Sequence, residues 1–153
     1  MAYKFSLDFQ KHILASVVSD AGFLRDCHEI IRPEFFGDEL LGGVAECAVE
    51  FWIREKECPS QTALLKEIKT HVAPGRKLHE YVELIEEIFG RELQSNAKYY
   101  QTQAVQFARS QAVFGALREA PMLLEAGEVD EIMRRVSQAS QVGVGLDERN
   151  VYD

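Results

Sequence analysis

His28 and His79 are each followed by a glutamate, a pairing that approaches the helical zinc motif H-E-x-x-H. In that motif, histidines at i and i+4 bind Zn²⁺ from one helix face and the glutamate serves as general base. Arg32 occupies the second ligand position after His28, where its positive charge would repel the metal. Glu83 occupies that position after His79, so these two side chains could share one helix face. We interpret both pairs as charged helix surface, and we expect neither a metal site nor catalytic residues.

A phosphate-binding P-loop has the pattern G-x-x-x-x-G-K-[ST], in which the lysine reaches the phosphates and the hydroxyl contacts the metal. The chain contains no Gly-Lys dipeptide. Gly75-Arg76 and Gly90-Arg91 come nearest, and neither has the upstream glycine. The serines and histidines do not suggest a nucleophilic triad either. We therefore expect no ATP hydrolysis, no cofactor and no enzymatic activity in this chain.

Carboxylates cluster in two stretches, 80–87 and 125–131, and the formal net charge of the whole chain is -8. Such clusters are typical of solvated helix faces, and the alternative is a docking surface for a basic partner. An acidic surface repels phosphate backbones, so we expect DNA to bind this chain only weakly if at all.

Cys27, Cys47 and Cys58 are odd in number and form no C-x-x-C pair, which favours reduced thiols over disulfides or a metal site. Cys27 and Cys47 stand among apolar residues at helical spacing and resemble small buried hydrophobes. The N-terminus lacks the pattern of a signal peptide, and no apolar run approaches the roughly 18 residues of a membrane span. We expect a cytoplasmic protein without a membrane partner.

Apolar residues recur at helical spacing through most of the chain, and no segment of useful length alternates as a strand does. The sequence therefore predicts an all-α fold, with an N-cap at Ser6 or Asp8. Phe35 and Phe36 follow Pro33 and predict a turn held to the core by its two rings. The expected helices cover about 7–18, 23–31, 38–56, 59–72, 78–89, 95–126 and 129–139.

The last two of these helices predict a hairpin that turns near Gly127. Tyr100, Phe107 and Phe114 recur every seven residues, so they share one side of the long helix, and small residues such as Ala104 mark a second apolar face. Two helices cannot bury two apolar faces between themselves. Either one face packs on the N-terminal half and the other on the return helix, or one face meets another copy of the chain.

The run from Phe9 to Ile68 has paired apolar residues at helical spacing, the aromatic corner Arg32-Pro33-Glu34-Phe35-Phe36 and a breaker at Pro59. With these features it resembles the N-terminal domain of DnaB-type replicative helicases, especially the phage versions. In that family a helix is followed by an aromatic corner and then by a second apolar helix. The pattern "Pt…tLl" comes after that helix. The matching positions here are Ile13-Leu14, Phe23-Leu24, Ile30-Ile31, Pro33, Phe35-Phe36, Val44, Val49, Phe51-Trp52, Pro59, Thr62 and Leu64-Leu65. The glycines and Tyr152 of the tail match the stretch that leads to the motor in phage helicases.

The resemblance implies a globular helical head over 1–92, a helical hairpin over 93–141 and a linker over 142–153 toward an ATPase domain. It implies a non-catalytic module that self-associates as a dimer, or as a trimer of dimers in a hexameric helicase, and that binds primase or a helicase loader. ATP and Mg²⁺ would belong to the motor domain alone, in a bacterial or phage-infected cell. The hairpin residues that would form the interface are Tyr100, Phe107, Phe114, Leu117, Ile132 and Met133.

Two other interpretations stay open. The helicase-binding C-terminal domain of DnaG-type primases resembles the same combination of head and hairpin. The chain could also be a stand-alone all-α regulator, or a small enzyme whose site no motif reveals. The reading frame beyond Asp153 would separate the alternatives: a P-loop there indicates a helicase, and a polymerase core upstream of the chain indicates a primase.

Overall fold

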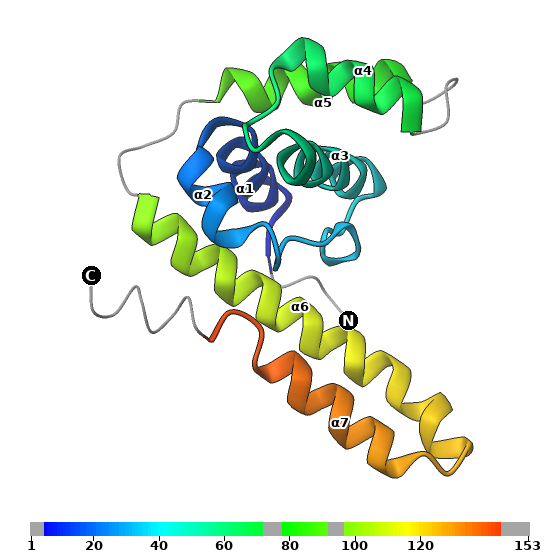
Figure 1. The fold of residues 1–153 in the computed structure, drawn as a ribbon. Coiled ribbons are helices and arrows are strands. Elements are labelled where there is room, and N and C mark those ends of the chain that lie inside the picture. Colours follow the sequence, from blue (N-terminus) through cyan, green and yellow to red (C-terminus); the bar gives the residue numbers. More distant parts are fainter. Residues whose placement is uncertain (1–4, 72–77, 92–96, 145–153) are drawn as a thin grey trace. The chain divides into compact units, whose positions relative to one another are not determined.

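The computed structural model describes residues 5–71, 78–91 and 97–144 (Figure 1). These residues form seven α-helices, one short 3-10 helix and no strand, which confirms the predicted all-α class. The chain divides into two units, Met1–Ala97 and Lys98–Asp153, where the sequence predicted a head over 1–92 and a hairpin over 93–141. Within the described part of the chain, no helix has both the length and the hydropathy needed to cross a membrane.

The first unit begins with helices α1 (Leu7–Ser19) and α2 (Ala21–Cys27). Ser6 caps α1 as predicted, because its hydroxyl accepts a hydrogen bond of 3.1 Å from the backbone N–H of Phe9. The prediction that the second helix runs on to Ile31 is wrong. Pro33 disfavours the helical conformation for Arg32, which is extended, and the chain leaves the helix through a turn over 28–30.

A glycine pair in α3 (Glu39–Glu55) lets two other elements approach that helix closely. A Cβ on Gly42 would lie 2.7 Å from the backbone oxygen of Pro33, in the 3-10 helix η1 (Pro33–Phe35). A Cβ on Gly43 would lie 2.7 Å from the Tyr81 hydroxyl of α5 (Leu78–Gly90). The two rings after Pro33 are buried, as the sequence predicted. The glycines therefore bring the aromatic corner and α5 onto α3.

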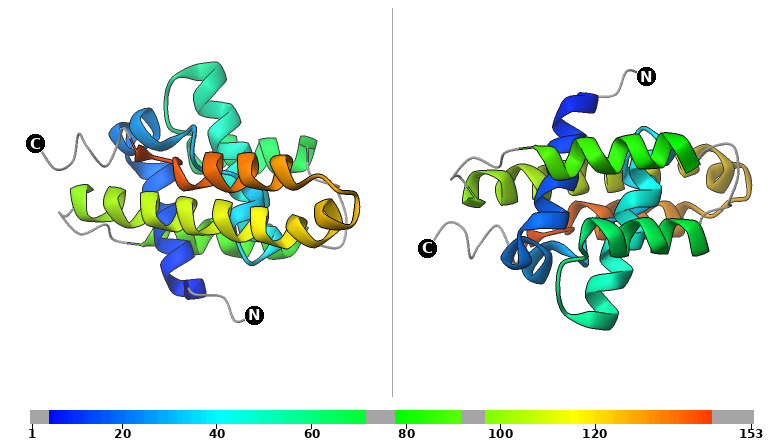
Figure 2. Two further views of the ribbon diagram at one scale, coloured as in Figure 1. Left: turned by 90° about the horizontal axis from the view of Figure 1, so that it is seen from below. Right: turned by 90° about the horizontal axis from the view of Figure 1, so that it is seen from above.

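Helix α4 (Gln61–His71) completes the first unit and packs against α3 and α5. Its core residues Leu64 and Ile68 are four apart, so they share the face that is buried. Helix α4 lies alongside α5 in the views of Figures 1 and 2. Helix α5 in turn packs on α1 as well as on α3, so the first unit is held together around α1, α3 and α5.

The second unit is an antiparallel pair of helices, α6 (Ala97–Glu125) and α7 (Val129–Ser140), which lie side by side in Figures 1 and 2. The turn between them is a Schellman motif. Gly127 has a positive φ of 76°, its N–H donates to Leu124 O at 3.0 Å, and the Glu128 N–H donates to Leu123 O at 2.8 Å. Gly127 thus ends α6 where the sequence predicted the turn, and α6 continues through Pro121 before it does so.

Candidate interaction surfaces

Large apolar side chains are exposed mainly on the hairpin. Among the described residues, Leu7 and Ile53 are the exposed examples in the first unit. The hairpin carries the others: Tyr99, Leu117, Met122, Leu124, Val129 and Met133. Scattered exposed apolar residues are normal on a protein surface, whereas a large contiguous apolar patch marks an interaction site.

Most of these side chains belong to the end of the hairpin that carries the turn. Leu117 and Leu124 are seven residues apart on α6, so they lie on one face of that helix. Val129 and Met133 are four apart on α7, so they also share a face. Leu117 is 54% exposed and Met133 is 65% exposed. We call Leu117, Met122, Leu124, Val129 and Met133 the tip cluster.

The six residues predicted for an interface differ in their exposure. Leu117 and Met133 are exposed, and Tyr100, Phe114 and Ile132 are half-buried. Phe107 has no exposed surface at all. Whether any of the six residues contacts another copy of the chain stays a prediction.

Three residues of the tip cluster were missed from the sequence: Met122, Leu124 and Val129. One signal was available, because Leu124 follows Leu117 by seven residues and extends its face of α6.

An ion pair joins the two hairpin helices, and further ion pairs lie within α7. Arg135 of α7 pairs with Glu119 of α6 and also donates a hydrogen bond of 2.8 Å to Glu131. Arg134 donates to the same carboxylate, and the hydrogen bonds from the two guanidinium groups lower the pKa of Glu131 to about 2. Glu131 therefore stays ionised, and the acidic stretch 125–131 is partly neutralised within the hairpin.

The first unit carries a shallow open groove of about 250 Å³ between the start of α1, the start of α3 and one face of α5. Its apolar lining consists of four leucines and its polar lining of four carboxylates and one lysine. These residues are Leu7, Leu40, Leu41, Leu84, Asp38, Glu80, Glu83, Glu87 and Lys11. The stretch 80–87, which the sequence identified as acidic, supplies the α5 side.

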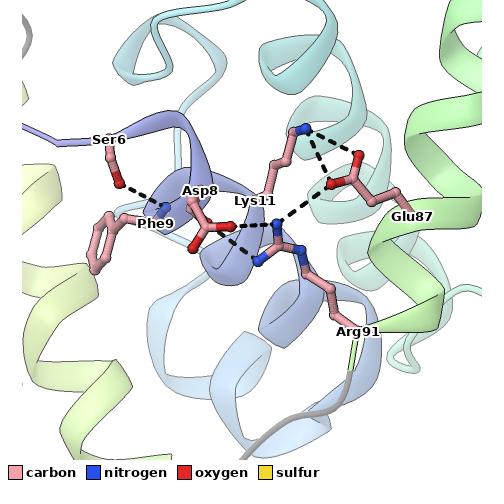
Figure 3. A network of polar contacts seen from close by, with 6 residues as sticks. All are labelled: Ser6, Asp8, Phe9, Lys11, Glu87 and Arg91. Carbon is pink, nitrogen blue, oxygen red and sulfur yellow. Dashed lines mark hydrogen bonds and ion pairs between the residues drawn. The ribbon is translucent and has the colours of Figure 1, made fainter.

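An ion-pair network joins α1 to α5 and includes two lining residues of this groove, Lys11 and Glu87 (Figure 3). The Lys11 Nζ lies 3.0 Å and 3.2 Å from the two carboxylate oxygens of Glu87. Arg91, just after α5, places its Nη2 2.8 Å from Asp8 Oδ1 and 3.5 Å from Glu87. The hydrogen bond from Lys11 lowers the pKa of Glu87 below its ordinary value, and that from Arg91 lowers the pKa of Asp8.

The residues considered for metal chemistry are not brought together. His79 Nε2 lies 3.0 Å from Glu83 Oε1 on an exposed face of α5, and the His28 ring is hydrogen-bonded to the backbone oxygen of Leu24 at 2.9 Å. Among the residues that the structure describes, no three histidine, cysteine or acidic side chains are placed to hold a metal ion. His79 and Glu83 therefore belong to the exposed surface of α5, and His28 lies in the turn that follows α2.

The cysteines are not arranged for nucleophilic chemistry. Cys27 and Cys47 are buried, as predicted, and Cys58 is half-buried. Burial raises the pKa of Cys47 to about 12 and also raises that of Cys58. Their thiols stay protonated at neutral pH, whereas a nucleophilic cysteine needs a lowered pKa.

No family of known proteins matches this chain, and no curated protein and no solved structure matches it significantly. The surfaces of the molecule and the residue pattern of the sequence therefore carry the functional inference.

Proposed function

We propose that this chain is a non-catalytic oligomerisation and partner-docking module, and that it serves as the N-terminal domain of a DnaB-type replicative helicase. The observation that carries the proposal is the tip cluster, a set of exposed apolar side chains near the turn of a helical hairpin. Burying such side chains against a second copy would contribute favourable free energy in proportion to the apolar area removed from water. The residue pattern over 9–68 supplies the link to replication.

The distribution of charge favours the hairpin as the surface that pairs with itself. Residues 97–144 contain five lysines and arginines and five acidic residues, for a net charge of zero. Residues 1–96 contain eleven lysines and arginines and seventeen acidic residues, for a net charge of -6. Two hairpins can therefore approach without net repulsion, whereas two heads repel each other.

The acidic head suits the second half of the proposal, the docking of a partner protein. Its charge disfavours nucleic acid, so contact with the DNA would fall to other parts of a helicase. The proposed role thus assigns self-association to the neutral hairpin and partner binding to the acidic head.

The reading frame beyond Asp153 tests the assignment to a helicase. We expect a continuous frame that encodes a P-loop ATPase. A zinc ribbon and polymerase core upstream of the chain would instead assign it to a primase, whose helicase-binding domain combines a head and a hairpin in the same way. Stop codons at both ends would contradict both assignments and favour a stand-alone regulator.

A further inference from the structure

The groove on the first unit combines an apolar floor with an acidic rim. Leu7 lines the groove at the start of α1, and its side chain is 49% exposed. The volume of about 250 Å³ lies below the roughly 300–1,000 Å³ of pockets that enclose small molecules. The groove therefore suits one or two anchoring side chains of a protein partner better than a cofactor.

The rim keeps a negative charge even though part of it is already paired. Glu87 is engaged by Lys11 and Arg91, as Figure 3 shows. Asp38 caps α3, because its Oδ1 accepts a hydrogen bond of 2.7 Å from the Leu40 N–H.

Glu80 and Glu83 complete the rim on the α5 side. They are exposed and three residues apart, so they lie on one face of the helix. The neighbour of Glu83 is His79, which is positive only when it is protonated. Glu80 and Glu83 therefore lie beside the leucines of the groove, and neither has a lysine or an arginine among its described partners.

We infer that this groove is the docking site for a basic amphipathic segment of a partner protein. An apolar side chain of that segment would occupy the floor beside Leu7, and its lysines or arginines would face Glu80 and Glu83. The net charge of -6 on residues 1–96 would attract such a segment over a longer range. The same charges repel nucleic acid and anionic lipid. This inference rests on the partner-docking half of the proposed function and gives it a location and a ligand chemistry.

The test uses the full chain and a fluorescein-labelled amphipathic peptide built from leucine and lysine, with binding followed by fluorescence anisotropy. We expect saturable binding that weakens as salt increases. The double variant Glu80→Gln/Glu83→Gln should weaken binding about three- to tenfold, as the loss of two rim ion pairs implies. Leu7→Ser should weaken it as well, because it removes part of the apolar floor.

The matched control is Glu46→Gln/Glu86→Gln, which removes two exposed carboxylates of the same unit that do not line the groove. We expect this control to bind the peptide like the original chain. Equal weakening by both double variants would overturn the inference, because binding would then report only the overall acidity. Absence of saturable binding, or equal binding of a leucine-glutamate peptide, would also overturn it.

Sedimentation of the same variants separates this inference from the proposed self-association. The groove variants should keep the mass of the original chain, since the tip cluster is unchanged. If the groove variants lose peptide binding and keep their mass, the result supports the groove as the docking site. If the original chain is monomeric and still binds the peptide, the result refutes only the proposed self-association.

Discussion

Arg109 of α6 donates a hydrogen bond of 2.8 Å from its Nε to the backbone oxygen of Val142, beyond the end of α7. The next residue, Gly143, has a φ of 74° and brings its Cα so close to α6 that a Cβ would lie 2.6 Å from Val105. The hydrogen bond and the close packing therefore hold the segment after α7 against α6. At the other end of the hairpin, the Schellman motif at Gly127 fixes the turn between the two helices. A hairpin fixed at both ends can present a defined surface to a partner.

Arg109→Ala should loosen the open end of the hairpin. The substitution removes a hydrogen bond from a charged donor, and we expect a loss of about 1.5–3 kcal/mol in the free energy of unfolding. Urea denaturation followed by circular dichroism measures this loss. Arg134→Ala is the control, because the described partners of Arg134, Glu131 and Gln138, belong to its own helix. Equal losses in the two variants would show that the bond to Val142 contributes nothing specific.

Gly127→Ala and Gly115→Ala should change stability in opposite directions. Alanine at 127 would have to adopt the left-handed conformation, so we expect a loss of about 1 kcal/mol or more. Gly115 is inside α6 with no atom within 4 Å of an added Cβ, so alanine there should raise stability by about 0.5–1 kcal/mol. Thermal and urea unfolding of both variants checks the signs. A stabilising Gly127→Ala would contradict the Schellman turn.

Gly42→Ala should destabilise the first unit although alanine is the better helix former. The added methyl group would meet the backbone oxygen of Pro33 at 2.7 Å, and backbone cannot move aside as a side chain does. We expect a loss of about 1–3 kcal/mol in the free energy of unfolding. The Gly115→Ala variant controls for helix propensity. A gain in stability at position 42 would show that the aromatic corner packs less closely on α3.

Sequence reasoning predicted the elements of this fold better than it predicted which faces they bury. Ser6 and Gly127 act through local hydrogen bonds and backbone conformation, so the sequence around them was sufficient. The spacing of Tyr100 and Phe107 shows that they share a face, but it does not show which part of that face is covered. The groove could not be predicted, because its walls come from three helices that are far apart in the sequence.

The network around Arg91 should make part of the stability dependent on pH. The ordinary pKa values of Asp8 and Glu87 are 3.8 and 4.5, and ion pairing lowers both in the folded chain. Carboxyl groups with lowered pKa stabilise the fold above their ordinary pKa, and this contribution is lost as the pH falls through the folded value. Arg91→Ala should raise the pKa of both groups toward the ordinary values.

Titration of the two carboxyl carbons by NMR measures this change directly. The control is Arg25→Ala, because Arg25 pairs with Asp26 and lies outside the network. Unchanged pKa values for Asp8 and Glu87 in Arg91→Ala would contradict the geometry of Figure 3.

The proposed function depends on the tip cluster. Leu117 and Met133 are the members that the sequence also predicted for an interface, and both are exposed, so polar substitutions there should leave the fold intact. The matched control is Ile53→Ser, which changes an exposed apolar residue of the first unit. Far-ultraviolet circular dichroism should show equal helix content in all variants.

The most direct measurement is sedimentation equilibrium of the original chain, Leu117→Ser/Met133→Gln and Ile53→Ser over a range of concentrations. We expect the original chain and Ile53→Ser to form a dimer or a larger assembly. The double variant should raise the dissociation constant by about tenfold or more, because apolar side chains of this size contribute on the order of 1.5–3 kcal/mol each when buried. An original chain that remains monomeric at all concentrations, or a folded double variant that associates unchanged, would contradict self-association through the hairpin tip.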